Sequence, residues 1–335
     1  MSSKLAVQLS DLSKSFRTRR ARKGGFGASL YDLVRPRSET LLAIDKVSFS
    51  IARGERVAFI GPNGAGKSTT LKVLSGILRP DSGHAEVLGL VPWRDRRRLA
   101  FSIGTVFGQR SQLWYHLPAR DTFELLARVY EVEKGRHDRR KSRLCEAFQL
   151  GSLLDRPVSQ LSLGERMRCE IVASLLHEPR ILFLDEPTIG LDVSAKAEVR
   201  ALLQEQSNED GATLLLTSHD TGDIEQVCSR VLVIHGGRML WDGSLPELRQ
   251  RYIRKKQLTL WSERETLSLE LTGVSTLSAA PYKTVLEVDL AVTSVGAVVV
   301  AALQASALRD LAIEDAPLDE VIRALYAHAE VREKS

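Results

Sequence analysis

The chain has 335 residues, of which 43% are hydrophobic and 27% are charged, and this ordinary composition excludes a disordered or fibrous protein. A chain of this length can form one large domain and a smaller one. Its formal net charge of +5 suits nucleic acid or an anionic membrane surface as a partner. A mild excess of this size is usually only solvation, so charge alone does not choose between partners.

Cysteine spacing and hydropathy favour a reducing, cytosolic setting. Cys145, Cys169 and Cys228 lie far apart and form no CxxC pair, so neither a disulfide framework nor a zinc knuckle is encoded. No apolar run reaches the roughly 18 residues that a membrane span needs, and the N-terminus lacks the apolar core of a signal peptide. The most apolar stretch, Val295–Leu303, is too short to span a membrane. We expect it to form a buried helix of a small domain.

The first distinctive segment is a basic insertion, residues 17–41, between Phe16 and an expected strand over residues 43–51. It contains seven basic residues and three glycines, and its SLYDLV stretch indicates a short helix. A solvated loop is compatible with this composition. Contact with anionic lipid heads or with a membrane partner is equally compatible.

A phosphate-binding loop is the strongest local signal. Gly61–Thr70 reads GPNGAGKSTT, follows the apolar run Val57–Ile60 and precedes a helical pattern. Strand, glycine loop and helix in this order make the GxxxxGK[ST] match credible. The glycines let backbone N–H groups turn toward phosphate oxygens at the positive end of a helix dipole. Lys67 is placed to reach the terminal phosphates, and the Ser68 hydroxyl to bind Mg²⁺.

Residues 113–176 have the apolar spacing of helices and include an unusual stretch, LSLGERMR, at residues 161–168. A serine and a glycine stand before a charged helix-forming run, with no base, metal ligand or nucleophile beside them. A hydroxyl and a close backbone N–H at a helix N-terminus make an anion site that lacks a base. Near the start of this region, Trp114 and Tyr115 suit either docking to a partner or core packing.

Two further strands end in side chains that suit nucleotide chemistry. Ile181–Pro187 (ILFLDEP) is an apolar run that ends in Asp185, placed to hold Mg²⁺, and Glu186, placed to polarise an attacking water. The strand Thr213–Thr217 is followed by Ser218 and His219, and the histidine is placed to donate a hydrogen bond to a γ-phosphate. Ligands bind at the carboxyl ends of such parallel strands, so we expect these groups to meet.

These motifs, in this order, resemble the nucleotide-binding subunits of ABC transporters over residues 5 to about 248. In that family a loop glutamine, here Gln109, and a signature, usually LSGGQ and here Leu161–Glu165, lie between the two Walker motifs. A D-loop follows, here residues 190–192. The resemblance implies that the signature caps the γ-phosphate held by a second subunit in a head-to-tail dimer. LSLGERMR would then serve the partner's nucleotide.

The resemblance implies ATP and Mg²⁺ as cofactors and assigns roles to individual residues. The implied ATP-binding residues are Phe16, Gly61, Pro62, Asn63, Gly64, Ala65, Gly66, Lys67, Ser68 and Thr69. The implied catalytic residues are Lys67, Gln109, Glu186 and His219, and the implied magnesium ligands, partly through water, are Ser68, Gln109 and Asp185. The implied contacts to the partner's ATP are Ser162, Leu163, Gly164 and Glu165, with Asp192 in the D-loop. Phe16 is expected to stack on adenine, although a core role suits it nearly as well.

The signature departs from the family pattern at two positions. Leu163 replaces a glycine, and Glu165 replaces a glutamine. Leu163 adds bulk and restricts the backbone. Glu165 suits the helix dipole but faces the charge of the phosphate unless it is turned away. We expect slower or differently coupled hydrolysis, and not a dead site, because Glu186 and His219 are both present.

The C-terminal part predicts a second domain. A strand pair (231–234 and 238–242) and a helix (245–252) close the cassette, and a basic hinge over residues 249–257 follows. Alternating patterns at 258–262, 267–273 and 284–292 predict strands, and helical stretches are expected around 297–308 and 318–326. Residues 258–335 are expected to form a small α+β domain of ferredoxin-like type that mediates interaction or dimerisation.

The expected fold class is therefore α/β. Residues 1–248 would form a P-loop NTPase, an ABC cassette with a mostly parallel core sheet, an antiparallel β subdomain and a helical subdomain over 113–176. Residues 89–97, 108–118, 161–170 and 313–326 look like a bacterial group of ATP-binding subunits that work with ABC type-2 export permeases, some of them viologen or drug exporters.

The resemblance implies an ATPase bound peripherally to hydrophobic permease subunits at the cytoplasmic face of the bacterial inner membrane. It pairs with a second nucleotide-binding subunit, as a homodimer or heterodimer, and no nucleic acid is expected. Two alternatives stay open: a soluble ABC ATPase that acts on nucleic acid or ribosomes, and the energy subunit of an importer.

Overall fold

The computed structural model describes residues 5–19, 38–108, 111–252, 255–315, 318, 320–323 and 325–326. The chain divides into two compact units, residues 1–243 and 244–335. The division falls shortly before residue 248, where we predicted the end of the cassette. In place of a separate basic hinge over 249–257, helix α9 (Leu245–Tyr252) and strand β10 (Lys255–Ser262) occupy most of that segment.

A six-stranded sheet in the order β5-β6-β7-β3-β8-β9 forms the centre of the first unit. Strands β5 to β8 pair in parallel, with β3 between β7 and β8. Their buried faces are the apolar runs in the sequence, which is typical of parallel strands covered on both sides. The strands are β3 (Arg56–Ile60), β5 (Ile103–Phe107), β6 (Ile181–Asp185), β7 (Thr213–Thr217), β8 (Arg230–His235) and β9 (Arg238–Ser244).

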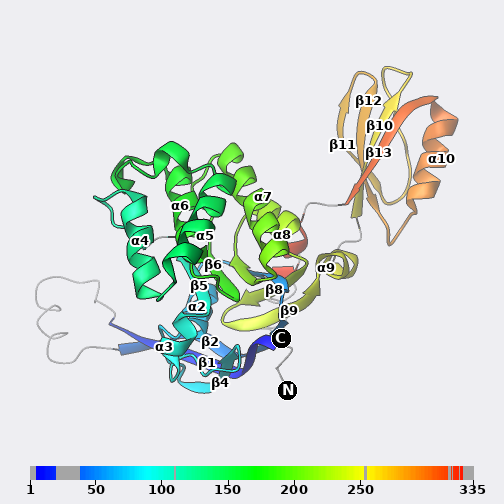
Figure 1. Ribbon diagram of the computed structural model, residues 1–335. Helices are drawn as coiled ribbons and strands as arrows, with labels where there is room; N and C mark the ends of the chain where they lie inside the picture. Colours follow the sequence, from blue (N-terminus) through cyan, green and yellow to red (C-terminus); the bar gives the residue numbers. More distant parts are fainter. Residues whose placement is uncertain are drawn as a thin grey trace, which may run out of the picture. The chain divides into compact units, whose positions relative to one another are not determined.

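An antiparallel sheet in the order β2-β1-β4 lies below this core (Figure 1). Its strands are β1 (Leu5–Arg19), β2 (Ser38–Ala52) and β4 (Ser82–Val87). β1 and β2 therefore extend into both ends of the predicted insertion, residues 17–41, and Arg17 pairs with Thr40. Residues 20–37, with the predicted short helix, lie outside the described residues.

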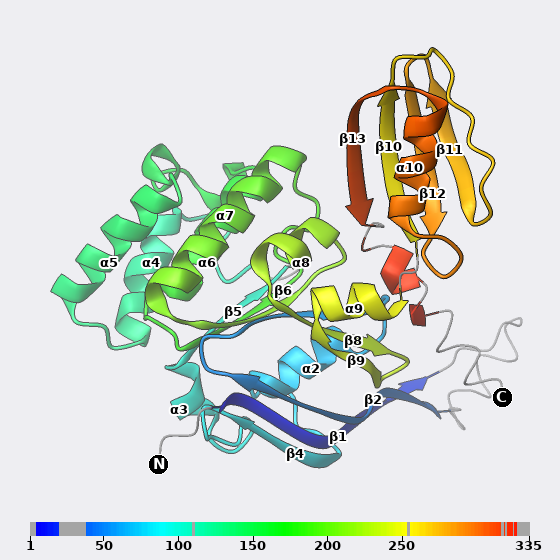
Figure 2. The same ribbon diagram turned by 90° about the vertical axis from the view of Figure 1, so that its right-hand side faces the viewer.

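Helix α2 (Lys67–Leu74) packs between the two sheets and contacts β2, β4 and β6 (Figure 2). Leu71, Val73 and Leu74 are fully buried in one apolar cluster with Phe49 of β2 and Phe59 of β3. The helix starts directly after the glycine loop, so this packing fixes the loop against the sheet edge.

A group of helices stands beside β5 and β6 at one end of the core sheet (Figure 1). Trp114 and Tyr115, before the first of them, are about half exposed, which excludes them from the core. The helices of the first unit are α3 (Arg96–Ala100), α4 (Ala119–Val129), α5 (Lys134–Ala147), α6 (Leu163–Leu175), α7 (Val193–Asp210) and α8 (Thr221–Val227), with short 3₁₀ turns at Gly151–Leu153 and Val158–Gln160.

The second unit contains a four-stranded sheet in the order β11-β12-β10-β13, with helix α10 against one face (Figure 2). The elements are β11 (Val274–Ala280), β12 (Lys283–Asp289), α10 (Val295–Ala305) and β13 (Leu308–Asp315). Among the described residues, no helix is long and apolar enough to cross a membrane.

Three predictions for this unit were wrong in detail. Residues 267–273 are irregular and not a strand, because Leu267, Leu269 and Leu271 pack on the apolar cluster from an unpaired segment. The strand β13 was missed because its residues are mostly exposed, so no burial pattern marks it. Helix α10 is buried only on one face, since Val298 and Ala302 are covered while Val300 and Leu303 are more than half exposed.

Candidate functional site

The carboxyl ends of β3, β6 and β7 meet at one edge of the core sheet, as predicted. Residues 61–66 join β3 to α2, and Ser68 and Thr69 stand in the first turn of that helix. Gly66 has a left-handed φ of 109°, and a Cβ atom added there would overlap the carbonyl oxygen of Ala43. Gly66 is also the N-cap of α2 and offers no side-chain cap. The first N–H groups of α2 are therefore not capped by a side chain and suit phosphate oxygens.

The ammonium group of Lys67 is held at the centre of this edge. Its Nζ donates to the carbonyl oxygens of Gly61 (2.6 Å) and Pro62 (3.2 Å) and lies 3.2 Å from Nε2 of His219. Only 5% of the residue is exposed. Burial lowers the pKa of Lys67, and the nearby carboxylates of Glu186 and Asp185 oppose that shift. A cation in this position attracts an anion strongly, because little water screens it.

The two carboxylates at the end of β6 point to different partners. Asp185 Oδ1 accepts from the hydroxyls of Ser68 (3.1 Å) and Thr217 (2.7 Å). The backbone N–H of Glu186 donates to Oγ1 (3.1 Å) and to the carbonyl oxygen (3.0 Å) of Thr217. Thr217 therefore fixes both acids to the end of β7.

Glu186 adopts a strained backbone conformation that directs its side chain into the site. Its φ is 54°, in the left-handed region that non-glycine residues rarely occupy. Its Oε1 lies 2.8 Å from Nε2 of His219. Lys67, Glu186 and His219 thus converge on one point, where a general base, a cation and a histidine can all reach the same phosphate and water.

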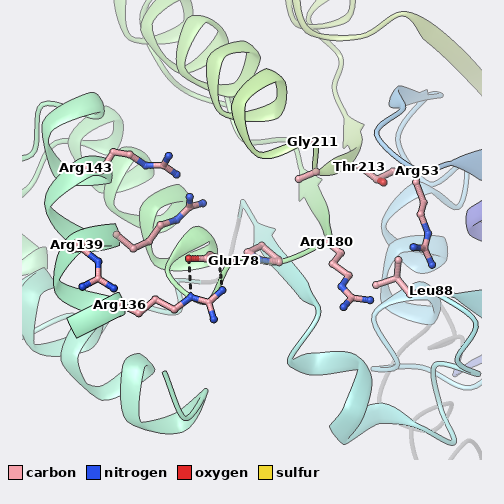
Figure 3. A pocket seen from close by; sticks show the side chains of 12 residues that line it. Arg53, Leu88, Arg136, Arg139, Arg143, Glu178, Arg180, Gly211 and Thr213 are labelled. Atoms are coloured by element: carbon pink, nitrogen blue, oxygen red, sulfur yellow. Dashed lines mark hydrogen bonds and ion pairs between the residues drawn. The ribbon is translucent and has the colours of Figure 1, made fainter. Parts of the chain in front are cut away.

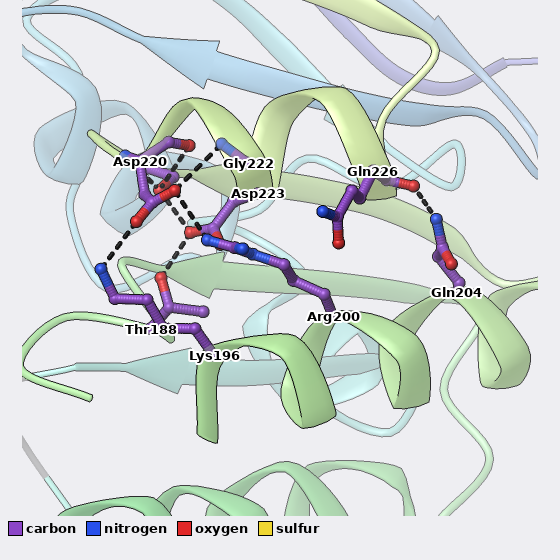
Figure 4. Close-up of polar contacts among 9 residues, drawn as sticks. Thr188, Lys196, Arg200, Gln204, Asp220, Gly222, Asp223 and Gln226 are labelled. Carbon is purple, nitrogen blue, oxygen red and sulfur yellow. Dashed lines mark hydrogen bonds and ion pairs between the residues drawn. The ribbon is translucent and has the colours of Figure 1, made fainter. Parts of the chain in front are cut away.

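The loop that carries His219 is held by a buried network of polar contacts (Figure 4). The carboxylate of Asp223, only 1% exposed, accepts from the hydroxyls of Thr188 and Ser218 and from Nε of Arg200 (2.6 Å). Arg200 Nη2 also pairs with Asp220 Oδ1 at 2.6 Å. The network joins four segments: the chain just beyond β6, helix α7, the loop after β7 and helix α8, which carries Asp223. A buried carboxylate with this many partners fixes its neighbours firmly.

The stretch LSLGERMR begins helix α6, and Ser162 is its N-cap. Ser162 Oγ accepts from the N–H of Glu165 (3.2 Å), while Glu165 Oε2 accepts from the N–H of Ser162 (2.7 Å), which together form a capping box. The hydrogen bond from the Ser162 N–H lowers the pKa of Glu165, and Arg156 lies 3.4 Å from its other oxygen. The carboxylate is therefore turned back onto its own helix.

The signature lies beside the predicted D-loop. Ser162, Leu163 and Gly164 line a hollow of about 280 Å³ together with residues 190–192. Leu163 is 37% exposed and its Cδ2 reaches to 2.9 Å from the position that a Cβ on Gly190 would take. Asp192 caps α7 by accepting from the N–H of Ala195 (2.8 Å). The bulk of Leu163 thus occupies space over the D-loop.

Phe16 lies on a different sheet from this cluster. Phe16 is partly buried on β1, opposite Leu41 of β2, and Lys14 Nζ lies 5.8 Å from its ring centroid. Gln109 lies outside the described residues.

The prediction from sequence missed Thr217, Arg200 and Asp223. Thr217 had a usable signal, because it is a polar residue at the end of an apolar strand. Arg200 and Asp223 had none, since their pairing depends on α7 packing against α8, and strand β7 separates these helices in the sequence.

Known proteins resemble this chain. The ABC transporter family matches residues 44–189. The daunorubicin resistance ATP-binding protein DrrA3 of Streptomyces coeruleorubidus is 38% identical over 207 residues, which are 62% of this chain and 65% of that protein. The ABC transporter ATP-binding protein NatA of Bacillus subtilis is 30% identical over 212 residues, 63% of this chain and 86% of that protein. The chain thus spans slightly less than two thirds of the length of the first relative.

A solved structure of the ATP-binding subunit of an ABC transporter has a TM-score of 0.60 and 26% sequence identity to this chain. The match covers 74% of this chain and 93% of that one.

Proposed function

Because the chain belongs to the ABC transporter family, we propose that it binds and hydrolyses ATP and so powers an ABC exporter. The observation that carries the proposal is the position of His219 between Lys67 (3.2 Å) and Glu186 (2.8 Å) at the carboxyl edge of the core sheet. A cation, a carboxylate and a histidine at one point, beside an uncapped helix N-terminus, suit the γ-phosphate of a nucleotide and an attacking water.

The proposed reaction is the attack of water on the γ-phosphorus of ATP, which breaks the bond to the β,γ-bridging oxygen and yields ADP and phosphate. Glu186 Oε1 accepts the proton of the water, and Lys67 stabilises charge on the phosphate oxygens. His219, held against Glu186 at 2.8 Å, contacts the same phosphate. Phe16 is the proposed stacking surface for adenine.

The site also suits Mg²⁺. The Ser68 hydroxyl and the Asp185 carboxylate lie 3.1 Å apart and offer the hard oxygen ligands that Mg²⁺ prefers. We assign these two residues as its holders, partly through water, with Gln109 as the third. The ion would neutralise charge on the β- and γ-phosphates.

The second half of the proposed site comes from a partner subunit. Ser162 and Gly164 offer a hydroxyl and a backbone N–H at the N-terminus of α6, and the neighbouring Glu165 carboxylate is occupied by its capping box. The two residues therefore suit binding of the partner's γ-phosphate without chemistry. Leu163, Glu165 and Asp192 line the same surface. Shared ATP would join two cassettes, and hydrolysis would let them separate.

Export is the direction that we propose. The relative named for daunorubicin resistance supports it, because resistance to a drug fits its removal from the cell. The proposed partners are two hydrophobic permease subunits of the ABC type-2 kind and a second nucleotide-binding subunit, at the cytoplasmic face of the inner membrane. Trp114 and Tyr115, about half exposed beside the helical group, are the proposed docking side chains.

ATP turnover tests the enzymatic part. Glu186→Gln is expected to lower the steady-state ATPase rate by about a hundredfold or more while ATP binding persists, because only the proton acceptor is lost. Glu205→Gln, which removes an exposed carboxylate from α7, is the matched control and is expected to leave the rate unchanged. Equal rates for the Glu186 variant and the wild type would overturn the assignment of the base.

Capture from native membranes tests the transport part. Tagged Glu186→Gln protein, held with ATP in detergent-solubilised membranes, is expected to retain a polytopic membrane protein. Recovery of ribosomes or nucleic acid, with no membrane chain, would replace the exporter with a soluble ABC ATPase. A captured permease that takes its cargo inward would favour an importer.

A further inference from the structure

A second concave site lies at the opposite edge of the core sheet from the ATP site. Its lining includes Arg180, which precedes β6, Thr213 at the start of β7, and Arg53 in the turn before β3. These are the amino ends of the same strands whose carboxyl ends hold the phosphate loop and the two acids. The hollow has a volume of about 770 Å³ (Figure 3). It is within the range of small-molecule sites and separate from every residue assigned to ATP.

Helix α5 supplies one wall of the hollow with a single stripe of arginines. The positions i, i+3, i+4 and i+7 of this helix face the same side, and here they are Arg136, Arg139, Arg140 and Arg143. Like charges at these spacings destabilise a helix by a few tenths of a kcal/mol per pair. An anion bound along the stripe would remove that repulsion.

The opposite wall carries Arg53 and Arg180, so guanidinium groups face one another across the hollow (Figure 3). Glu178 lies between the walls and forms two hydrogen bonds with Arg136, which lower the pKa of this glutamate. Within the described part of the chain, Arg53, Arg139 and Arg180 form no ion pair. The hollow thus combines six guanidinium groups with one carboxylate among its lining residues.

The choice of arginine narrows the ligand. None of the described residues that line the hollow is a lysine, and a planar guanidinium binds phosphate oxygens in pairs, with geometry that an ammonium group lacks. Arginines on two facing walls suit a ligand that carries several phosphates and enters the hollow. A flat lipid surface would reach the rim arginines but not both walls together.

We propose that this arginine pocket binds a soluble oligophosphate or a small molecule with several phosphate groups. The pocket lies in the same unit as the ATP site, behind β6 and β7, whose other ends carry Asp185, Glu186 and His219. Binding is a property of the free chain and does not depend on turnover or on a permease.

The test is calorimetric titration of inorganic tripolyphosphate into the full chain with saturating ADP, which fills the nucleotide site. A fluorescent ADP analogue monitors whether tripolyphosphate displaces nucleotide. One tripolyphosphate is expected to bind per chain without displacing the analogue. Arg139→Gln with Arg180→Gln is expected to weaken this binding by about tenfold or more, because one contact is lost from each wall.

Arg97→Gln with Arg98→Gln is the matched control. It removes the same charge from exposed positions on α3, outside the pocket, and is expected to leave binding within about twofold. If the double variant does not fold, Arg53→Gln changes a third segment and serves as an independent variant. It is expected to bind tripolyphosphate more weakly than the wild type. Circular dichroism melts check folding in each case.

Three results would overturn the proposal. The first is that tripolyphosphate does not bind at all, and the second is that its affinity falls equally in the pocket and control variants. The third is displacement of the fluorescent ADP analogue at the same tripolyphosphate concentrations that release heat. Vesicles of phosphatidylglycerol test whether lipid headgroups bind in place of a soluble ligand. If they bind through Arg139 and Arg180 while tripolyphosphate does not, the phosphates belong to lipid headgroups and the soluble ligand is wrong.

Discussion

Glu165 stands at the point of the signature where the ABC pattern has a glutamine. Its carboxylate accepts from the N–H of Ser162 at 2.7 Å and lies 3.4 Å from Arg156, so it does not extend freely from the helix N-terminus. The negative charge nevertheless sits within one turn of the N–H groups that we assign to the partner's phosphate. We therefore expect this residue to stabilise its own helix and to weaken the attraction for ATP across the proposed dimer.

We predict that Glu165→Gln raises kcat/KM for ATP about fivefold. Removal of one unit of negative charge near the shared phosphate is worth about 1 kcal/mol in a partly solvated site, and glutamine still accepts the Ser162 N–H bond. The free energy of unfolding is expected to fall by about 0.3–1 kcal/mol, since the charge no longer complements the helix dipole. Steady-state ATPase kinetics and thermal melts measure the two effects.

The matched control is Glu133→Gln, which removes a similar carboxylate from the N-cap of α5, where it accepts from Gly135 and Arg136. Its kcat/KM is expected to equal that of the wild type.

The pKa of Glu165 is below its ordinary value. Its stabilising effect is therefore present at pH values above the ordinary pKa and is lost as the pH falls through the lowered pKa. This account is contradicted if the stability of Glu165→Gln falls at acidic pH as steeply as that of the wild type.

Individual site residues were predictable where a short motif determines the chemistry. Lys67, Asp185 and Glu186 are each named by the order of apolar strand, loop and charge, and the structure brings them to one sheet edge as expected. The direction in which Glu165 turns was not predictable. It depends on the capping geometry and on Arg156, which lies nine residues earlier in a separate turn.

At the level of elements, helix α7 and the loop after β7 are joined by the Asp223 network. The carboxylate of Asp223 binds hydroxyls from Thr188 and Ser218, which stand beside Glu186 and His219 in the sequence. Movement of α7 against α8 would therefore move the base and the histidine together. Since Asp192 of the predicted D-loop is the N-cap of α7, this connection links the proposed subunit interface to the proposed site of hydrolysis.

We predict that Asp223→Asn lowers kcat about tenfold with little change in ATP binding, because the His219 loop loses its main anchor. The free energy of unfolding is expected to fall by about 3 kcal/mol, since Arg200 keeps only its pairing with Asp220. Gln204→Ala is the control: it breaks the contact with the Gln226 carbonyl at the far end of the same helix pair (Figure 4) and is expected to spare kcat. A less stable Asp223 variant with full kcat per folded molecule would reduce the network to a structural role.

A strand or helix could be predicted from the sequence where a single residue pattern determines it. The parallel strands β3, β6 and β7 follow from apolar runs, and the predicted fold class is confirmed by the cassette structure that matches this chain. The second unit was harder. An alternating pattern at 267–273 comes from leucines that pack without pairing, while β13 pairs with β10 and has no alternation of burial.

In the whole molecule, part of the positive charge is gathered in one pocket. The formal net charge is +5, and the arginine pocket alone contains six guanidinium groups and one carboxylate among its lining residues. The pocket was not predicted from the sequence, because its two walls come from separate segments: α5 on one side, and Arg53 and Arg180 on the other. The two ends of this sheet thus hold cations, Lys67 at the edge proposed for ATP and the arginines at the edge proposed for the oligophosphate.

ATP is expected to join two chains. A cassette that holds the phosphate loop and the signature on different surfaces completes its site only with a second cassette, and slow hydrolysis keeps that pair together. Glu186→Gln protein is therefore predicted to double its mass in light scattering with ATP and Mg²⁺, and to stay single with ADP. Adding Ser162→Arg is expected to abolish the doubling, because a long side chain then fills the phosphate position at the N-terminus of α6.

Ser152→Arg adds the same side chain at an exposed turn of the helical region and is expected to leave the dimer intact. If Glu186→Gln binds ATP fully yet keeps the mass of one chain, the signature does not act on a second copy, and the partner must be a different nucleotide-binding subunit.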